Sequence, residues 1–331
     1  MSATAAIAAT DSAVGAARPV TDAAADVISG AKPPRGALGR SAMDGPAWVG
    51  WAFIAPFALC YLGLLAAPVL EGFWLSFNAV DLLTGKGQFV GLANFLDLVR
   101  DEVFLRCARN TIFFAAICTP AFVGLGLALA LVLNRPGRTG AWLRGTFFAS
   151  NVLSVTVVTL IWRLVLLPDR GLLSQSLAAF GLPDLAPLSN ESLALPFIAL
   201  VTLWWGIGLP MMLILAALQQ IPPDLYEAAA LDNASRWRSF RFITLPALRR
   251  TLIMVAIIQV IGQLQVFGQA QLLTNGGPNN STRTLVMFIY EALFDQWALG
   301  YSAAAAQILF VLMVLGVSFQ RWAERREGAQ T

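Results

Sequence analysis

Six apolar runs, each about 20 residues long or longer, restrict the fold of this sequence more than any other feature. They cover residues 48–70, 112–133, 145–167, 194–218, 251–273 and 301–320. An α-helix rises about 1.5 Å per residue, so each run is long enough to cross the roughly 30 Å hydrocarbon layer of a bilayer. Charged residues make up only 12% of the chain, against roughly a quarter in soluble domains. The sequence therefore predicts an all-α polytopic membrane protein with six transmembrane helices.

Several classes of chemistry are excluded by missing residue types. The chain has no histidine, which is the commonest general base and a frequent zinc ligand. Its two lysines, Lys32 and Lys86, are followed by Pro and Gly, whereas a phosphate-binding loop needs Lys followed by Ser or Thr. The basic residues are dispersed around the apolar runs and offer no face for nucleic acid. We expect no catalytic residue, metal or cofactor, and any ATP hydrolysis must come from another chain.

Composition divides the chain into three parts. Residues 1–45 are rich in Ala, Ser, Asp, Pro and Gly, which predicts a disordered tail. Residues 46–110 hold the first transmembrane helix and a polar segment with a short helix near residues 92–103. Residues 111–325 hold the other five helices, which form a core with a polar loop at residues 221–250. Six spans bring both termini to the same side of the membrane.

Basic residues set the expected orientation, because loops that face the cytoplasm carry the excess of lysine and arginine. With the amino terminus in the cytoplasm, 15 of the 22 basic residues lie on the cytoplasmic side and 6 on the other. Both termini and the 221–250 loop are then cytoplasmic. Residues 168–191 and 274–300 then face outward.

The 221–250 loop holds five arginines and three carboxylates between two apolar runs that carry no charge. The proline pair near its start favours the first turn of a helix, and Asn233 tolerates the left-handed backbone that ends one. A second short helix from Ser235 is expected to end at Leu245 and Pro246. Two such helices predict a small-residue knob that fits a groove on a partner. The alternative is an amphipathic hairpin that lies on lipid.

Glutamines are concentrated in the fifth run, at Gln259, Gln263, Gln265 and Gln269. On one continuous helix, each pair spaced by four residues shares a face, and the two faces lie about 120° apart. Such a helix is not expected to face lipid broadly. The glutamines are expected either to line a path for a polyhydroxylated solute or to form hydrogen bonds that hold the helices together.

The fourth run holds two tryptophans, Trp204 and Trp205, close to Pro210. Because proline removes a hydrogen bond from the preceding turn, this helix is expected to bend near mid-membrane. Tryptophan rings stack on sugars, although they also simply pack. Asn151 and Gln307 are further polar residues of the third and sixth runs. The candidates for the substrate path are therefore Gln263, Gln265, Trp204, Trp205, Asn151 and Gln307.

Two other classes of membrane protein are alternatives for this sequence. One is a self-sufficient secondary carrier or channel for a polar solute, and the other is an integral membrane enzyme. Proton-coupled and sodium-coupled carriers often depend on carboxylates within the membrane, and the second to fifth runs contain none. The missing histidines and the missing carboxylate pairs count against an enzyme as well.

The 221–250 loop resembles the EAA loop of binding-protein-dependent ABC importer permeases. The family pattern E-A-A, D-G-A and I-x-L-P is matched by Glu227-Ala-Ala-Ala-Leu-Asp232-Asn-Ala234 and by Ile243-Thr-Leu245-Pro246. Residues 91–95 (Gly-Leu-Ala-Asn-Phe) and 273–278 (Leu-Thr-Asn-Gly-Gly-Pro) are similar to the carbohydrate-uptake branch, which includes maltose and glycerol-phosphate transporters. The resemblance extends over about residues 48–320. Asn233 stands in place of the usual glycine, and Arg250 in place of a common proline.

This resemblance implies the type I ABC importer permease fold, in a bacterial cytoplasmic (inner) membrane. It implies a sugar or oligosaccharide substrate that is moved by alternating access. The implied partners are an ATPase subunit pair that uses the ATP, a second homologous permease subunit and an external solute-binding protein. The loop would be the coupling helix that docks in the ATPase. The residues implied for that contact are Glu227, Ala228, Ala229, Asp232, Asn233, Ala234, Leu245 and Pro246.

Overall fold

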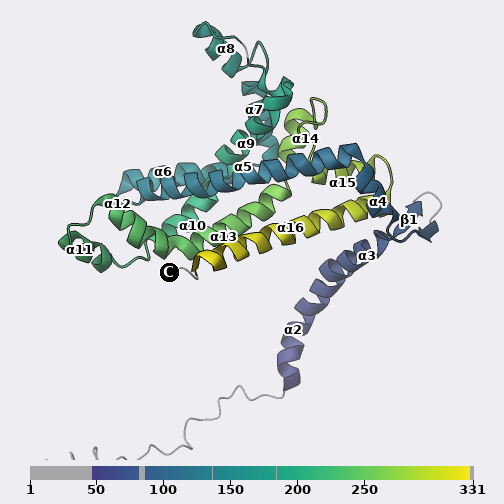
Figure 1. The fold of residues 1–331 in the computed structure, drawn as a ribbon, viewed down its shortest axis with the longest axis horizontal. Helices are drawn as coiled ribbons and strands as arrows, with labels where there is room; N and C mark the ends of the chain where they lie inside the picture. The colour runs from purple at the N-terminus through teal and green to yellow at the C-terminus, as the bar shows by residue number, and fades with distance from the viewer. Residues whose placement is uncertain (1–46, 82–85, 136, 184, 329–331) are drawn as a thin grey trace, which may run out of the picture. The chain divides into compact units, whose positions relative to one another are not determined.

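The structure is a computed structural model that describes residues 47–81, 86–135, 137–183 and 185–328. The tail predicted at residues 1–45 lies outside this part of the chain. The chain forms two compact units, Met1–Ala66 and Ala67–Thr331. The described part of the first unit is helix α2 (Ala47–Tyr61), which continues into the π-helical turn η1 (Leu62–Ala66) (Figure 1).

The second unit is built almost entirely of helices. Its elements are α3 (Ala67–Leu75), β1 (Asn78–Asp81), β2 (Lys86–Phe89), α4 (Ala93–Arg100), α5 (Glu102–Leu133), α6 (Arg138–Ala149), η2 (Ser150–Val152), α7 (Val155–Val165), α8 (Leu172–Ala179), η3 (Pro187–Ser189), α9 (Glu191–Gly206), α10 (Gly208–Leu218), α11 (Pro223–Leu231), α12 (Arg236–Ser239), η4 (Phe240–Thr244), α13 (Leu245–Leu264), α14 (Gly268–Thr274), α15 (Leu285–Phe294) and α16 (Leu299–Gly328).

Six membrane spans can be assigned within the described residues by length and composition. Four are single helical runs: Trp51–Leu75, Glu102–Leu133, Arg236–Leu264 and Leu299–Trp322. The other two are bent pairs, Arg138–Val152 with Val155–Val165 at 100°, and Glu191–Gly206 with Gly208–Leu218 at 49°. The six-span, helical architecture predicted from the sequence is confirmed when each bent pair is counted as one span.

The body of the second unit is organised around α5 and α13. Helix α13 packs against α5 on one side and α16 on the other, and α10 packs against both α5 and α13 (Figure 1). Phe122 and Ile198 are buried in a cluster shared by α5 and α9, and Ile214 and Leu248 in one shared by α10 and α13. Because lipid tails are as apolar as these side chains, the helices are held together chiefly by close packing and interhelical hydrogen bonds.

The polar segment before α5 contains a two-stranded hairpin that the sequence did not predict. Strands β1 and β2 pair antiparallel, with Asn78 opposite Phe89. The Asn94 side chain donates hydrogen bonds to the carbonyls of Ser76, at 2.8 Å, and of Asn78, at 3.2 Å, which fastens the hairpin to α4. Helix α16 passes so close that any side chain at Gly300 would overlap the Asn78 carbonyl.

Helix α5 begins well before its apolar run. The short helix expected at residues 92–103 is α4, which ends at Arg100, and Asp101 then caps the next helix. Its carboxylate accepts the backbone N–H groups of Val103, at 2.7 Å, and Phe104, at 3.2 Å. It also accepts a hydrogen bond from the Tyr301 hydroxyl at 2.9 Å, which joins the starts of α5 and α16. A good N-cap thus extends the helix beyond the hydrophobic pattern.

The third and fifth spans differ from the straight helices that the sequence predicts. The third turns by 100° because Leu153 and Ser154 adopt extended backbone between η2 and α7. The fifth ends at Leu264, although its apolar run continues to residue 273. At its start, the second short helix does not end at Pro246. It continues into α13 through the π-turn η4, in which wider hydrogen bonding accommodates the proline.

Gly208 supplies a test of this packing. A Cβ atom at this position would overlap the Phe147 carbonyl oxygen and lie 2.8 Å from the Phe148 Cα, so α10 would be forced away from α6. Gly208→Ala is expected to destabilise the protein by about 1–3 kcal/mol, the usual cost of overpacking. The measurement is the melting temperature of the detergent-solubilised protein. Gly124→Ala is the matched control, since a Cβ there meets nothing within 4 Å. Equal melting of the two variants would contradict the assigned contact.

Candidate functional site

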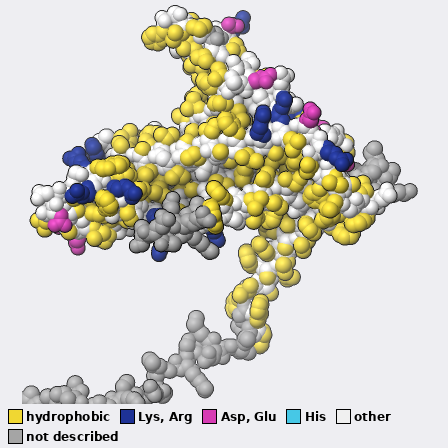
Figure 2. All heavy atoms as spheres, in the orientation of Figure 1, with side chains coloured by type: hydrophobic (Ala, Val, Ile, Leu, Met, Phe, Trp, Pro, Cys, Tyr) yellow, Lys and Arg dark blue, Asp and Glu magenta, His cyan; other side chains and the backbone are white. Residues whose placement is uncertain are grey.

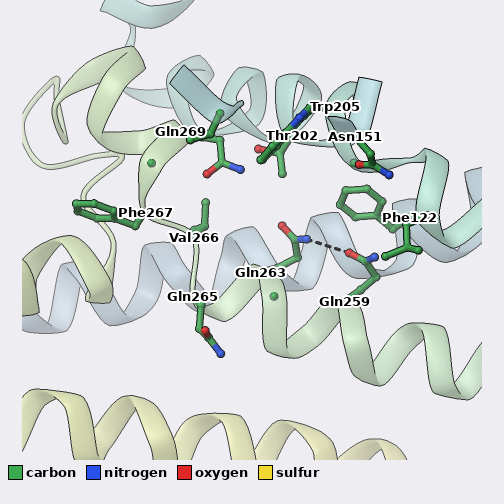
Figure 3. A pocket seen from close by; sticks show the side chains of 15 residues that line it. Phe122, Asn151, Thr202, Trp205, Gln259, Gln263, Gln265, Val266, Phe267 and Gln269 are labelled. Atoms are coloured by element: carbon green, nitrogen blue, oxygen red, sulfur yellow. Dashed lines mark hydrogen bonds between the residues drawn. The ribbon is translucent and has the colours of Figure 1, made fainter. Parts of the chain in front are cut away.

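Three interrupted helices meet at one cavity of about 360 Å³. The interruptions are the η2–α7 bend, the α9–α10 bend and the gap between α13 and α14. The lining residues are Phe122, Asn151, Val155, Thr202, Trp205, Gly206, Leu209, Gln259, Gly262, Gln263, Gln265, Val266, Phe267, Gly268 and Gln269 (Figure 3). Irregular backbone within a membrane is tolerated where it is buried in protein or lines a cavity. The three interruptions therefore make this cavity the candidate functional site.

Asn151 holds the α9–α10 bend open. Pro210 has no N–H to give to the carbonyl of Gly206, and the helix bends by 49° at Ile207, as the sequence predicts. In the amide orientation that satisfies its neighbours, Asn151 donates to the Trp205 carbonyl at 2.9 Å and accepts from the Leu209 N–H at 2.9 Å. In a straight helix these two backbone groups would bond to each other. Asn151 is thus inserted into the ladder and satisfies both.

Trp205 is fixed between the same two bends. Its indole N–H donates to the Leu153 carbonyl at 3.0 Å, and its own carbonyl accepts from the Ser150 hydroxyl at 3.1 Å. Leu153 lies in the extended stretch, where its carbonyl has no helical partner. The bend of the third span and the bend of the fourth therefore support each other through the side chain of Trp205.

The opposite wall of the cavity is made of glutamines. Gln259 and Gln263 lie one turn apart on α13, are 8% and 7% exposed, and are joined by a 3.0 Å hydrogen bond from Gln263 Nε2 to Gln259 Oε1. Gln269 enters from α14 (Figure 3). Across the cavity from Gln259 and Gln263 lie Thr202, Trp205 and Asn151 (Figure 3). Each glutamine amide offers both donors and an acceptor.

A side chain just before α15 satisfies a backbone group in the gap after α13. The Thr284 hydroxyl donates to the Val266 carbonyl at 2.8 Å, which satisfies a group that the broken helix leaves free. Gly268 starts α14 against α7, where an added Cβ would lie 3.2 Å from Val155. Gln265 is the C-cap residue that ends α13, and Gln269 lies on α14 beyond the gap, so the two do not share a face as they would on a continuous helix.

The lining carries no charged side chain among the residues that the structure describes. It combines amides, a threonine hydroxyl and the aromatic residues Trp205, Phe122 and Phe267. Such a surface donates and accepts hydrogen bonds and offers flat apolar faces, whereas it has no group to neutralise an ion. The cavity is suited to a neutral, hydroxyl-rich solute.

Three of the six residues predicted for the substrate path point into this cavity: Gln263, Trp205 and Asn151 (Figure 3). Gln265 borders it, but its side chain turns toward α16, where Nε2 lies 3.2 Å from the Met313 sulfur. Trp204 lies outside the lining and packs edge-on against Trp162, with ring centroids 5.6 Å apart. Gln307 of α16 is also outside the lining.

Some lining residues were not proposed from the sequence. Thr202 lies one turn before Trp205 on α9, so helical periodicity from Trp205 could have found it. Phe122 has no distinguishing signal, because it is one of many apolar residues of α5. Phe267 depends on where α13 ends, which the hydrophobic pattern does not show. Gln259 and Gln269 lie in the lining as well, in agreement with the path-lining alternative for the glutamines of the fifth run.

The 221–250 segment forms a second candidate site at one end of the unit. Helix α11 ends in a Schellman motif: Ala234 N–H donates to Ala229 O at 2.9 Å, and Asn233 N–H to Ala230 O at 3.1 Å. Asn233 has φ 53°, the left-handed backbone that the sequence predicts for this position. Asparagine accepts this conformation more readily than most residues other than glycine.

Most side chains of α11 and its turn are exposed to solvent. Glu227, Ala228 and Asp232 are exposed, and Leu231 is 86% exposed. Figure 2 shows charged side chains of both signs at this end of the unit, next to a surface of hydrophobic side chains. Six of the eight predicted contact residues lie on α11 and its turn. The other two, Leu245 and Pro246, begin α13 beyond η4.

Comparison with known proteins places this geometry in a family. Residues 122–328 match the family described as "Binding-protein-dependent transport system inner membrane component". The chain is 32% identical to the probable ABC transporter permease protein YurN of Bacillus subtilis, over 79% of this chain and 91% of the relative. It is also 32% identical to the lactose transport system permease protein LacF of Rhizobium radiobacter, over 84% of this chain and 94% of the relative.

A solved structure shares the fold. The chain resembles a subunit of a bacterial alginate ABC transporter, crystallised with an alginate pentasaccharide-bound periplasmic protein. The TM-score is 0.75 at 23% identity, over 84% of this chain and 94% of the other. The family match covers more than half of this sequence and includes the cavity-lining residues from Phe122 to Gln269 together with the exposed α11. The chain therefore belongs to the binding-protein-dependent inner membrane components, and it is a permease subunit of an ABC transporter.

Proposed function

We propose that this permease passes a neutral sugar or oligosaccharide through the cavity that its three interrupted helices enclose. The observation that carries this proposal is the lining itself. Buried amides on α13 face a fixed tryptophan, and the lining residues that the structure describes include no charged side chain. Sugar hydroxyls pair with amides, and sugar rings stack on indole. The relative LacF is named for lactose transport, which supports this substrate class.

The energy for transport comes from a separate ATPase in this proposal, and the permease itself is not catalytic. The exposed α11, with Glu227 and its neighbouring alanines, is the contact that docks in the ATPase. A slim, alanine-rich helix on a rigid turn suits insertion into a groove. The excess of basic residues on the α11 side supports a cytoplasmic position for α11 and for both termini, in the cell's inner membrane.

Two further partners complete the transporter. An external solute-binding protein delivers the sugar, which is supported by the periplasmic protein in the solved alginate complex. A second, homologous permease subunit forms the other half of the path. Alternating exposure of the cavity to the two sides of the membrane then moves the solute inward.

Purification distinguishes this function from a self-sufficient carrier. The tagged chain, taken from its native membrane in mild detergent, is expected to bring an ATPase subunit and a second permease with it. Reconstituted in liposomes with the binding protein, the complex should accumulate sugar only when ATP is present. Uptake by the isolated chain without ATP would overturn the proposal and establish the carrier.

The adjacent tryptophans test the path. Trp205→Ala removes a ring from the cavity and is expected to lower the maximal rate of ATP-driven uptake about tenfold, because stacking and the bend support are both lost. Trp204→Ala is the matched control, since Trp204 lies outside the lining. It should stay within about twofold of the parent protein. Equal loss in both variants would contradict a specific role for Trp205.

The proposed ATPase contact can be tested at Ala228. Ala228→Trp places a large ring on the exposed face of α11, and it should weaken ATPase binding by about thirtyfold or more, as disruption at an interface centre does. The measurement is the amount of ATPase retained on the purified permease. Membrane insertion and melting temperature should be unchanged, because Ala228 contacts solvent. Full retention of the ATPase would exclude α11 as the contact.

A further inference from the structure

A single side-chain hydrogen bond joins α11 to the π-turn η4. The hydroxyls of Tyr226 and Thr244 lie 2.9 Å apart. Within the described residues, this is the one side-chain hydrogen bond between α11 and another element. Thr244 is 4% exposed, so little water is available to replace its partner. The contact is therefore both specific and sheltered.

The space around this contact is loosely filled. An open pocket of about 400 Å³ lies beside this contact, between residues of α5, α11, α12 and η4. Its lining residues are Leu131, Tyr226, Ala230, Ala234, Arg236, Ser239, Phe240 and Thr244. Because packing here is incomplete, α11 and η4 are not joined by a continuous layer of packed side chains that could transmit a displacement of α11. Apart from the turn that joins α11 to α12, the hydrogen bond is the side-chain connection between α11 and η4.

Thr244 is placed to pass a displacement onward. It is the last residue of the π-turn η4, and α13 follows it without interruption from Leu245 to Leu264. A helix of this length spans about 30 Å and behaves as a stiff rod. Its far end carries Gln259 and Gln263, which line the substrate cavity. A movement applied at Thr244 is therefore delivered to the cavity wall.

We propose that Tyr226 is the positioning residue through which movement of α11 reaches α13 and reshapes the cavity. Tyr226 is half-buried and turned toward Thr244, whereas the neighbouring Glu227 and Ala228 are exposed. One short helix thus has a contact face and a transmission face. The inference rests on the proposed function, in which an ATPase moves α11.

Hydroxyl deletions test the transmission. In liposomes that hold the complete transporter with its binding protein, the measured quantity is sugar imported per ATP hydrolysed. Tyr226→Phe and Thr244→Val should each lower this ratio about fivefold, the effect of one hydrogen bond, while the ATPase stays bound and active. Thr244→Ser keeps the hydroxyl and should restore the ratio. The double variant should be no worse than either single variant, because both remove the same bond.

Tyr290→Phe is the matched control. Its hydroxyl makes no hydrogen bond to any described residue, and it should leave the ratio unchanged. Unchanged ratios in Tyr226→Phe and Thr244→Val, or additive losses in the double variant, would overturn the inference while the proposed function stands. If the parent complex shows no ATP-dependent uptake, the proposed function fails and the inference fails with it.

Discussion

Every backbone N–H and C=O group inside a bilayer needs a partner in the protein, because no water is available to it there. This constraint governs the arrangement around the cavity, where three helices stop and restart. Each interruption frees backbone groups, and a side chain from another element takes them up: Asn151 for the α9–α10 bend, Trp205 for the Leu153 carbonyl and Thr284 for the Val266 carbonyl. The interrupted helices around the cavity are stable because each one receives hydrogen-bond partners from a neighbouring element.

Close approach of the backbones is the second requirement. Gly208 lets α10 pass against α6, and Gly268 lets α14 start against α7. Without these contacts the side chains that satisfy the broken helices would not reach their targets. Small residues and polar partners therefore act together, and the loss of either would leave buried backbone groups unsatisfied. The result is a polar chamber held by a rigid frame.

Features that depend on local chemistry could be predicted from the sequence. The six spans follow from composition, the α9–α10 bend from Pro210, and the left-handed turn from Asn233. Features that depend on distant residues could not. Nothing local marks the end of α13 at Leu264, because the partner that accommodates the gap, Thr284, is far along the chain.

For the same reason, the sequence could not tell which of the candidate site residues face the cavity. Periodicity on an unbroken helix pairs Gln265 with Gln269, but the gap turns one toward α16 and leaves the other at the cavity. Neighbouring tryptophans differ by about 100° around a helix, so only packing decides that Trp205 faces inward and Trp204 outward. The partner of α11 stays a prediction, since the exposed residues show a free surface and not its occupant.

The uncharged lining of the cavity has an electrical consequence. Moving one elementary charge across a membrane potential of 100 mV changes the free energy by about 2.3 kcal/mol. A neutral solute held only by amides, a hydroxyl and aromatic rings carries no such charge, and none of these groups gains or loses a proton near neutral pH. For the neutral solute of the proposed function, these lining residues therefore add no charge of their own that the membrane voltage or the proton gradient could act on.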